Sequence, residues 1–174
     1  MDITEVILHQ HGEQRRMFAE LDEVPASDVE TLAAVWKRLE IFLETHAEAE
    51  ERYFYPQLLR FGTGAGDSEG VDDEVKDAIK DHNEIRDAIL KTRDHQPGSE
   101  EWQQAVLECR IANDDHMAEE ERQDLTDFRR HASLDLRHEI GVKFVRYEAL
   151  KAATGVPPVD KDPDEYIEHP PTGE

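Results

Sequence analysis

The sequence predicts an all-α protein: an up-down antiparallel four-helix bundle with an extra C-terminal helix and a proline-rich tail. Four long segments place apolar residues at steps of three and four, the period of a helix with one buried face. Short links rich in polar residues, glycine or proline separate these segments. The sequence has no competing strand pattern, and four amphipathic helices with short connections typically pack antiparallel around one core.

The first half of the chain predicts two of these helices. The first runs from Ile3 to Leu21 and ends at the turn "VPAS". Ser27 is the expected N-cap of the second helix, which is longer and reaches about Arg60. The inner stripe of this second helix contains Leu32, Trp36, Leu39, Leu43, His46, Glu50, Tyr53 and Gln57.

The second half predicts two further long helices and a shorter one. After "FGTGAGDSEG", a third helix begins near Val71 and ends before "HQPGS". Ser99 caps a fourth helix that continues to about Arg130. Ser133 caps a fifth, predicted over residues 134–152. Residues 1–152 are thus expected to form the helical domain, with its core in residues 1–130.

The last segment, residues 153–174, is acidic and holds five of the eight prolines. It has no helical or strand period, so we expect an extended or disordered tail. The tail can lie along the bundle through Tyr166 and Ile167, and it is a candidate contact for a protein partner.

Composition excludes several classes of function. The chain has 174 residues, 20 basic against 42 acidic, and a net charge of -22, which opposes binding to nucleic acid or to an anionic membrane. No segment is apolar enough to span a bilayer, and no secretory signal pattern opens the chain. The single cysteine, Cys109, fits a reducing compartment and is read as a buried packing residue rather than a redox partner. These features predict a cytoplasmic protein.

Histidines occupy the apolar stripe of each of the four long helices, near the middle of each: His11, His46, His82 and His116. Mid-helix positions of an antiparallel bundle come to one level, so four imidazoles are expected to meet in the core. Glu50 and Glu120 each follow a histidine by one turn on the same face. The other five histidines, His9, His95, His131, His138 and His169, lie off these stripes and are not expected to bind metal.

The His-x-x-x-acid spacing is weak evidence by itself. Composition produces roughly two such spacings among nine histidines, and the chain has four. Burial discriminates better, because a carboxylate in an apolar core needs a compensating partner. Either Glu50 and Glu120 reach water at the edge of the stripe, or they bind metal together with the histidines. Imidazole and carboxylate without thiolate suit iron, manganese or zinc.

The pattern resembles the hemerythrin-like family, also called the HHE cation-binding domain. The matching segments are "LHQHGEQRRMF", "LETHAEAEERYFYPQL", "IKDHNEIRDAI" and "DDHMAEEERQDL", and the resemblance covers residues 1 to about 130. It implies a four-helix bundle with two iron ions, oxo- or hydroxo-bridged, with zinc or manganese as less favoured metals. The implied ligands are His11, His46, Glu50, His82, His116 and Glu120.

Two positions depart from the oxygen-carrying members of the family. Those carriers have His-x-x-x-His on the third helix, where this chain has Arg86, and His-x-x-x-x-Asp on the fourth, where it has His116 and Glu120. One histidine ligand is therefore missing, which argues against reversible oxygen storage. Tyr55 is the family's usual aromatic position, whereas Tyr53 lies closer to the stripe by helical geometry. Either can be an additional ligand or a packing residue.

The expected function is binding or reduction of a small oxidant, hydrogen peroxide, dioxygen or nitric oxide, at a carboxylate-bridged iron pair. Catalase-like or peroxide-reducing turnover is one form of it, with Phe42, Leu43, Ile79, Ile85 and Val106 restricting access. A second hypothesis is a redox or oxygen sensor in which the state of the metals changes the docking of the fifth helix and the tail. A third is a bundle that is metal-free or holds zinc structurally.

Overall fold

The protein is described from a computed structural model, for residues 1–65 and 70–171. Within these ranges the chain is helical and contains no strand, which confirms the predicted class. The elements are α1 (Ile3–Glu23), α2 (Val29–Ala49), the π-helical turn η1 (Glu50–Phe54), α3 (Tyr55–Phe61), α4 (Val71–Thr92), α5 (Glu100–Arg122), α6 (Asp124–His131), α7 (Leu134–Lys151) and α8 (Pro163–Glu168).

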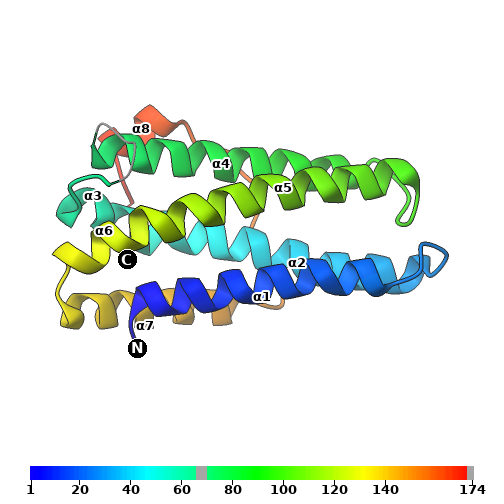
Figure 1. The fold of residues 1–174 in the computed structure, drawn as a ribbon, viewed down its shortest axis with the longest axis horizontal. Helices are drawn as coiled ribbons and strands as arrows, with labels where there is room; N and C mark the ends of the chain where they lie inside the picture. The colour runs from blue at the N-terminus through cyan, green and yellow to red at the C-terminus, as the bar shows by residue number, and fades with distance from the viewer. Residues whose placement is uncertain (66–69, 172–174) are drawn as a thin grey trace.

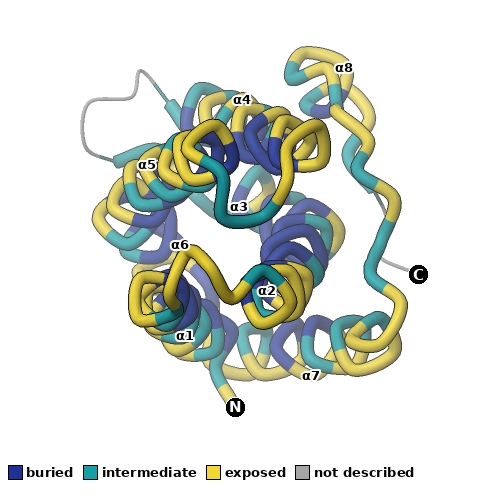
Figure 2. Tube along the Cα trace, turned by 90° about the vertical axis from the view of Figure 1, so that its right-hand side faces the viewer, coloured by how far each residue is buried: buried dark blue, intermediate teal, exposed yellow. Residues whose placement is uncertain are grey.

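The four long helices α1, α2, α4 and α5 form the bundle (Figure 1). α1 packs against α2 and α5, and α4 packs against α2 and α5, so the four helices enclose one core. Viewed from the end, α7 lies outside the bundle against α1 and α2, and α8 lies outside α4 (Figure 2). No helix among the described residues is both long and apolar enough to cross a membrane.

Two of the predictions about the helices need correction, the N-cap of the second helix and the continuity of the fourth. Asp28, not Ser27, caps α2, because the Asp28 side chain accepts a hydrogen bond from the backbone N–H of Thr31 at 3.1 Å. A carboxylate at this end also interacts favourably with the helix dipole. The fourth predicted helix bends at Gln123, where φ is -107° and ψ is -76°, and divides into α5 and α6. The predicted caps Ser99 and Ser133 are confirmed.

The core consists of two apolar clusters with a polar layer between them. One cluster, around Phe18, Trp36, Leu39 and Trp102, fills the end of the bundle that holds the α1–α2 and α4–α5 turns. The other fills the opposite end, where α3, α6 and α7 meet, and contains Ile3, Ile7, Phe54, Tyr55, Leu58, Val75, Ile79, Leu125, Phe128, Ile140 and Phe144. The polar layer between the two clusters holds the predicted ligands.

The described part of the tail, residues 153–171, is more ordered than we predicted from its prolines. Asp162 caps α8 by accepting the backbone N–H of Glu165, and Pro163 stands at the first helical position, where a missing N–H is harmless. Tyr166 of α8 is only 5% exposed and packs in the apolar cluster with Ile167 at its edge. The tail therefore lies along the bundle through the two residues that the sequence indicated.

Candidate metal centre

The predicted ligands come together in the middle of the bundle. His11 projects from α1, His46 from α2, His82 from α4 and His116 from α5, and none is more than 4% exposed. Glu50, at the start of η1, is 0% exposed and Glu120, on α5, is 1% exposed. This excludes the alternative in which the two glutamates reach water at the edge of the stripe.

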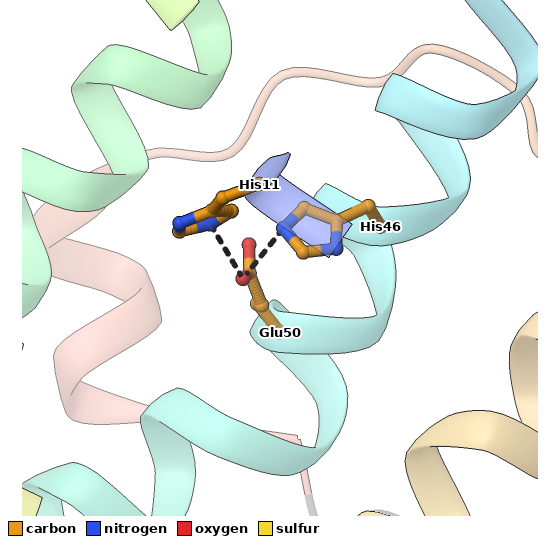
Figure 3. A group of neighbouring side chains, drawn as sticks. All are labelled: His11, His46 and Glu50. Atoms are coloured by element: carbon orange, nitrogen blue, oxygen red, sulfur yellow. Dashed lines mark ion pairs between the residues drawn. The ribbon is translucent and has the colours of Figure 1, made fainter. Parts of the chain in front are cut away.

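Glu50 lies between two groups of imidazoles. Its Oε1 is 2.8 Å from His46 Nε2 and 4.0 Å from His11 Nε2, and Figure 3 shows the carboxylate facing both rings. Its Oε2 points the other way and lies 3.3 Å from His82 Nε2. His11, His46 and Glu50 form one group able to hold a metal ion, and Glu50, His82 and His116 form another. One carboxylate thus belongs to both groups, as a bridging ligand would.

Glu120 lies outside these two groups but faces them. Its Oε2 is 3.1 Å from His11 Nε2, and both of its oxygens are buried without a hydrogen-bond partner. In the second group, His82 Nε2 and His116 Nε2 are 3.0 Å apart. Two donors bound to one ion at about 2.1 Å and at right angles would lie about 3 Å apart. The spacings in both groups fit donors around common ions.

A ring of outer partners holds the other nitrogen of each imidazole. Gln10 Oε1 lies 2.6 Å from His46 Nδ1, and Glu121 Oε1 lies 3.0 Å from His11 Nδ1. In the same way, Glu51 Oε1 is 2.8 Å from His82 Nδ1, and Asp81 Oδ2 is 3.5 Å from His116 Nδ1.

The ring is cyclic, because each helix supplies the partner for the histidine of the next: α1 for α2, η1 for α4, α4 for α5 and α5 for α1.

An oxygen acceptor at Nδ1 favours the tautomer with its proton there and leaves the Nε2 lone pair facing inward. His11 Nε2, His46 Nε2 and all four carboxylate oxygens of Glu50 and Glu120 make no hydrogen bond in the described protein. Acceptors that face one another in a buried space require a cation or protons between them. The donor set therefore fits metal ions.

The pKa values reflect the same crowding. Burial, and next the charge of Glu120, raises the pKa of Glu50 well above its usual value. Burial lowers the pKa of His46 well below its usual value, and burial followed by the charge of His116 lowers that of His82 to about 4. Burial alone would lower the pKa of His11, but the adjacent carboxylates of Glu120 and Glu121 raise it overall. Neutral imidazoles at His46 and His82 are the form that binds metal.

A π-helical turn decides which tyrosine reaches the centre. The backbone N–H of Tyr55 donates to the carbonyl of Glu50, five residues earlier, in place of the i→i−4 bond of an α-helix. Because this turn holds one residue more than an α-helical turn, the position that next faces the bundle core comes one residue later. Tyr55 is consequently fully buried with its hydroxyl 3.5 Å from His82 Nε2, whereas Tyr53 packs against Tyr147. Of the two tyrosines predicted as ligand or packing residue, Tyr55 adjoins the centre and Tyr53 does not.

The same turn takes from one buried carbonyl the two backbone donors that α-helical or π-helical geometry would give it. The N–H of Tyr55 is committed to Glu50, and Pro56, the fifth residue after Glu51, has no N–H to offer the carbonyl of Glu51. The hydroxyl of Tyr166, in the tail, donates to that carbonyl. The ammonium of Lys161 also binds the Glu51 carboxylate. The tail therefore holds Glu51, the residue that orients His82.

Arg86 stands where the oxygen carriers have a second histidine, and it belongs to the outer shell. Its guanidinium donates to Glu51 Oε1 at 2.6 Å and lies 3.5 Å from Glu44 Oε2. The side chain is 2% exposed, so its charge is held by these two carboxylates. The position therefore supports the predicted ligand His82 through Glu51, and its guanidinium is not itself a candidate ligand.

A family model of the hemerythrin HHE cation-binding domain matches residues 2–126, which is most of the chain. The chain belongs to this family. Hemerythrin domains bind metal ions, usually iron, and the histidine and glutamate groups of this HHE domain are placed to do so. No curated protein and no solved structure matched the chain.

Sequence reasoning missed the outer ring of this HHE domain. Gln10, Glu51, Asp81 and Glu121 are each the immediate chain neighbour of a predicted ligand, and that adjacency was the available signal. A residue next to an inward-facing position points towards the boundary with the adjacent helix.

The five histidines not expected to bind metal are all exposed. Cys109 is buried in the apolar cluster, and burial raises the pKa of its thiol.

Proposed function

We propose that this HHE domain is a non-heme di-iron protein that binds or reduces a small oxidant, such as hydrogen peroxide, dioxygen or nitric oxide. The observation that supports this most strongly is the set of buried Nε2 and carboxylate atoms that face inward. These atoms belong to the two groups that share Glu50, or to Glu120, which lies directly beside them. Such an arrangement is unfavourable without cations and favourable with them.

In this proposal His11 and His46 would hold one iron, His82 and His116 would hold the other, and Glu50 and Glu120 would be shared between them. Iron supplies the electrons and an open coordination position for the oxidant. In this proposal the chain contributes fewer ligands than the oxygen carriers have, because the position of their second histidine on this helix is Arg86, whose charged guanidinium pairs with Glu51. We propose that the vacant position favours reaction with an oxidant over reversible oxygen storage.

Residues around the ligands restrict and orient what enters. Leu43, Ile79 and Ile85 are buried, and Phe42 lies against His46 with ring centroids 6.2 Å apart. Burial raises the pKa of Tyr55 well above its usual value, so its phenol stays protonated. We propose that this hydroxyl acts as a hydrogen-bond donor towards the oxidant.

Metal content and an absorption spectrum test the proposal. Protein produced with ample iron is expected to carry about two irons per chain, with visible ferric absorption that changes on addition of hydrogen peroxide. Glu50→Ala, Glu120→Ala and His11→Ala should each lose iron. His9→Ala is the matched control, because His9 is exposed on the same helix. Wild-type protein that takes up no iron, or equal iron loss in His9→Ala, would overturn the proposal.

The tail contacts favour a second candidate, a redox or oxygen sensor. Lys161 and Tyr166 both bind Glu51, so a change at His82 has a direct path to the tail (residues 153–174). A sensor predicts that hydrogen exchange in residues 161–168 differs between the reduced and oxidised iron forms without peroxide turnover. Turnover with equal exchange in both forms favours the enzyme. The buried thiol of Cys109 and the acidic surface remain consistent with a cytoplasmic location, which is part of this proposal.

A further inference from the structure

An acidic cavity adjoins the candidate metal centre on the side of α4, α5 and α6. Its volume is about 130 Å³, and the residues that line it are Glu74, Asp77, Ala78, Asp81, His116, Glu119, Glu120, Arg122, Gln123 and Asp124. Six of these residues are carboxylates and one is an arginine. The lining also includes two predicted metal ligands, His116 and Glu120, so the cavity reaches the centre itself.

The cavity leads inward from solvent. Asp77 and Glu119 are exposed, whereas Glu74 and Asp124 are only 4% and 5% exposed. Glu120 lies further in, at 1% exposure. Carboxylates therefore continue from the surface through the cavity to the ligand that faces His11.

Glu74 provides an independent sign that the cavity receives a cation. Its Oε1 accepts the backbone N–H of Ala65 at 2.6 Å, but its Oε2 is buried without a hydrogen-bond partner. Burial, followed by the charges of Glu120 and Glu74, raises the pKa of Asp124 well above its usual value. Carboxylates crowded in this way gain free energy when a cation comes among them.

We propose that this cavity is the entry route for the metal ions, with Glu74 and Asp124 as a transit site for a hydrated divalent cation. The inference rests on the proposed metal centre. Oxygen ligands from α4 and α6, with water completing the coordination shell, suit ferrous or manganous ions, and the incomplete protein shell lets the ion pass on to Glu120. The same charges repel anions, whereas neutral oxidants such as hydrogen peroxide are unaffected.

Cobalt(II) uptake by the metal-free protein tests the route without any redox reaction. Cobalt bound by imidazole and carboxylate absorbs visible light, so stopped-flow absorbance reports arrival at the centre. The variant Glu74→Gln/Asp124→Asn keeps side-chain size and the acceptor for the N–H of Ala65. We expect cobalt uptake about tenfold slower than in the wild type, since a cleft lined with charges of one sign raises the association rate of a counter-ion by about 10-fold or more. The final number of metals per chain should be unchanged.

The matched control is Glu84→Gln/Asp87→Asn, which makes the same two kinds of substitution at exposed positions of α4, the helix that carries Glu74. Uptake by this control should keep the wild-type rate. Equal slowing in both variants would mean that net charge, not this cavity, governs entry, and would overturn the proposal. The proposal would also be overturned if Glu74→Gln/Asp124→Asn took up cobalt at the wild-type rate, whether or not its final number of metals per chain fell. Absence of cobalt uptake by the wild type would instead overturn the metal centre itself.

Discussion

Replacing Tyr166 with phenylalanine tests whether the tail completes the hydrogen bonding of the π-helical turn. The hydroxyl of Tyr166 donates to the carbonyl of Glu51, which Pro56 deprives of a backbone partner. Glu51 is 0% exposed and Tyr166 is 5% exposed, so water cannot replace the lost donor. A buried carbonyl left unpaired costs about 1–3 kcal/mol, and the phenylalanine ring keeps the apolar packing.

We therefore expect Tyr166→Phe to lower the free energy of unfolding by about 1–2 kcal/mol, which is a fall in melting temperature of roughly 2–8 °C for a chain of this size. The assay is urea unfolding of the metal-free protein, followed by far-ultraviolet circular dichroism, so that metal binding adds nothing to the measured stability.

A double-mutant cycle with Pro56→Ala isolates the cause. Alanine at position 56 brings back an N–H that can serve the carbonyl of Glu51, either in the π-helical turn or after the turn relaxes to an α-helix. In that background the loss from Tyr166→Phe should shrink to below about 0.5 kcal/mol, a coupling of about 1 kcal/mol. Equal losses in the two backgrounds would refute the account of the carbonyl, even if Tyr166→Phe alone is destabilising.

Three further predictions concern the shell around the centre. Glu51→Gln should weaken cobalt binding by roughly 10- to 100-fold, because the orientation of His82 depends on this carboxylate; unchanged affinity in a titration would contradict it. Arg86→Met should lower the free energy of unfolding by about 3–5 kcal/mol, since it removes the guanidinium from the buried carboxylates of Glu44 and Glu51 and leaves only Lys161 beside Glu51; a loss under about 1 kcal/mol in urea unfolding would contradict it. Burial raises the pKa of Glu148 from 4.5 in the unfolded chain to about 7 in the folded protein, and a hydrogen bond from Gln10 offsets part of this rise. Between pH 4.5 and about 7 the Glu148 carboxyl therefore holds its proton in the folded protein and loses it in the unfolded chain. Its contribution to stability is thus complete below pH 4.5 and is lost as the pH rises through about 7. Unfolding measured across this range should show that the stability of wild type relative to Glu148→Gln falls by about 1–3 kcal/mol as the pH rises, and a flat or rising difference would contradict this.

The positions of the six predicted ligands follow from local pattern. His11, His46, His82 and His116 lie on apolar stripes near the middle of their helices, and antiparallel packing then brings them to one level. Helical periodicity depends only on residues three and four apart, so the sequence shows it directly. The match to the hemerythrin HHE cation-binding domain agrees with this pattern.

The choice between Tyr53 and Tyr55 did not follow from that pattern. Regular helical geometry favoured Tyr53, because it assumes the same rotation at every residue. The π-helical turn at Glu50–Phe54 adds a residue to one turn just before Pro56 and brings Tyr55 to His82. The family resemblance named Tyr55 as the usual aromatic position, and the structure supplies the physical reason.

Residue type and short-range spacing are enough to predict the helical class, the buried stripes and the chemistry of the donors. The packed fold is needed to show which side chain holds each imidazole, how Lys161 and Tyr166 of the tail reach Glu51, and where the acidic cavity meets Glu120. Tyr166 lies 115 residues from Glu51 along the chain. Contacts of this kind depend on how whole helices pack, which local periodicity does not encode.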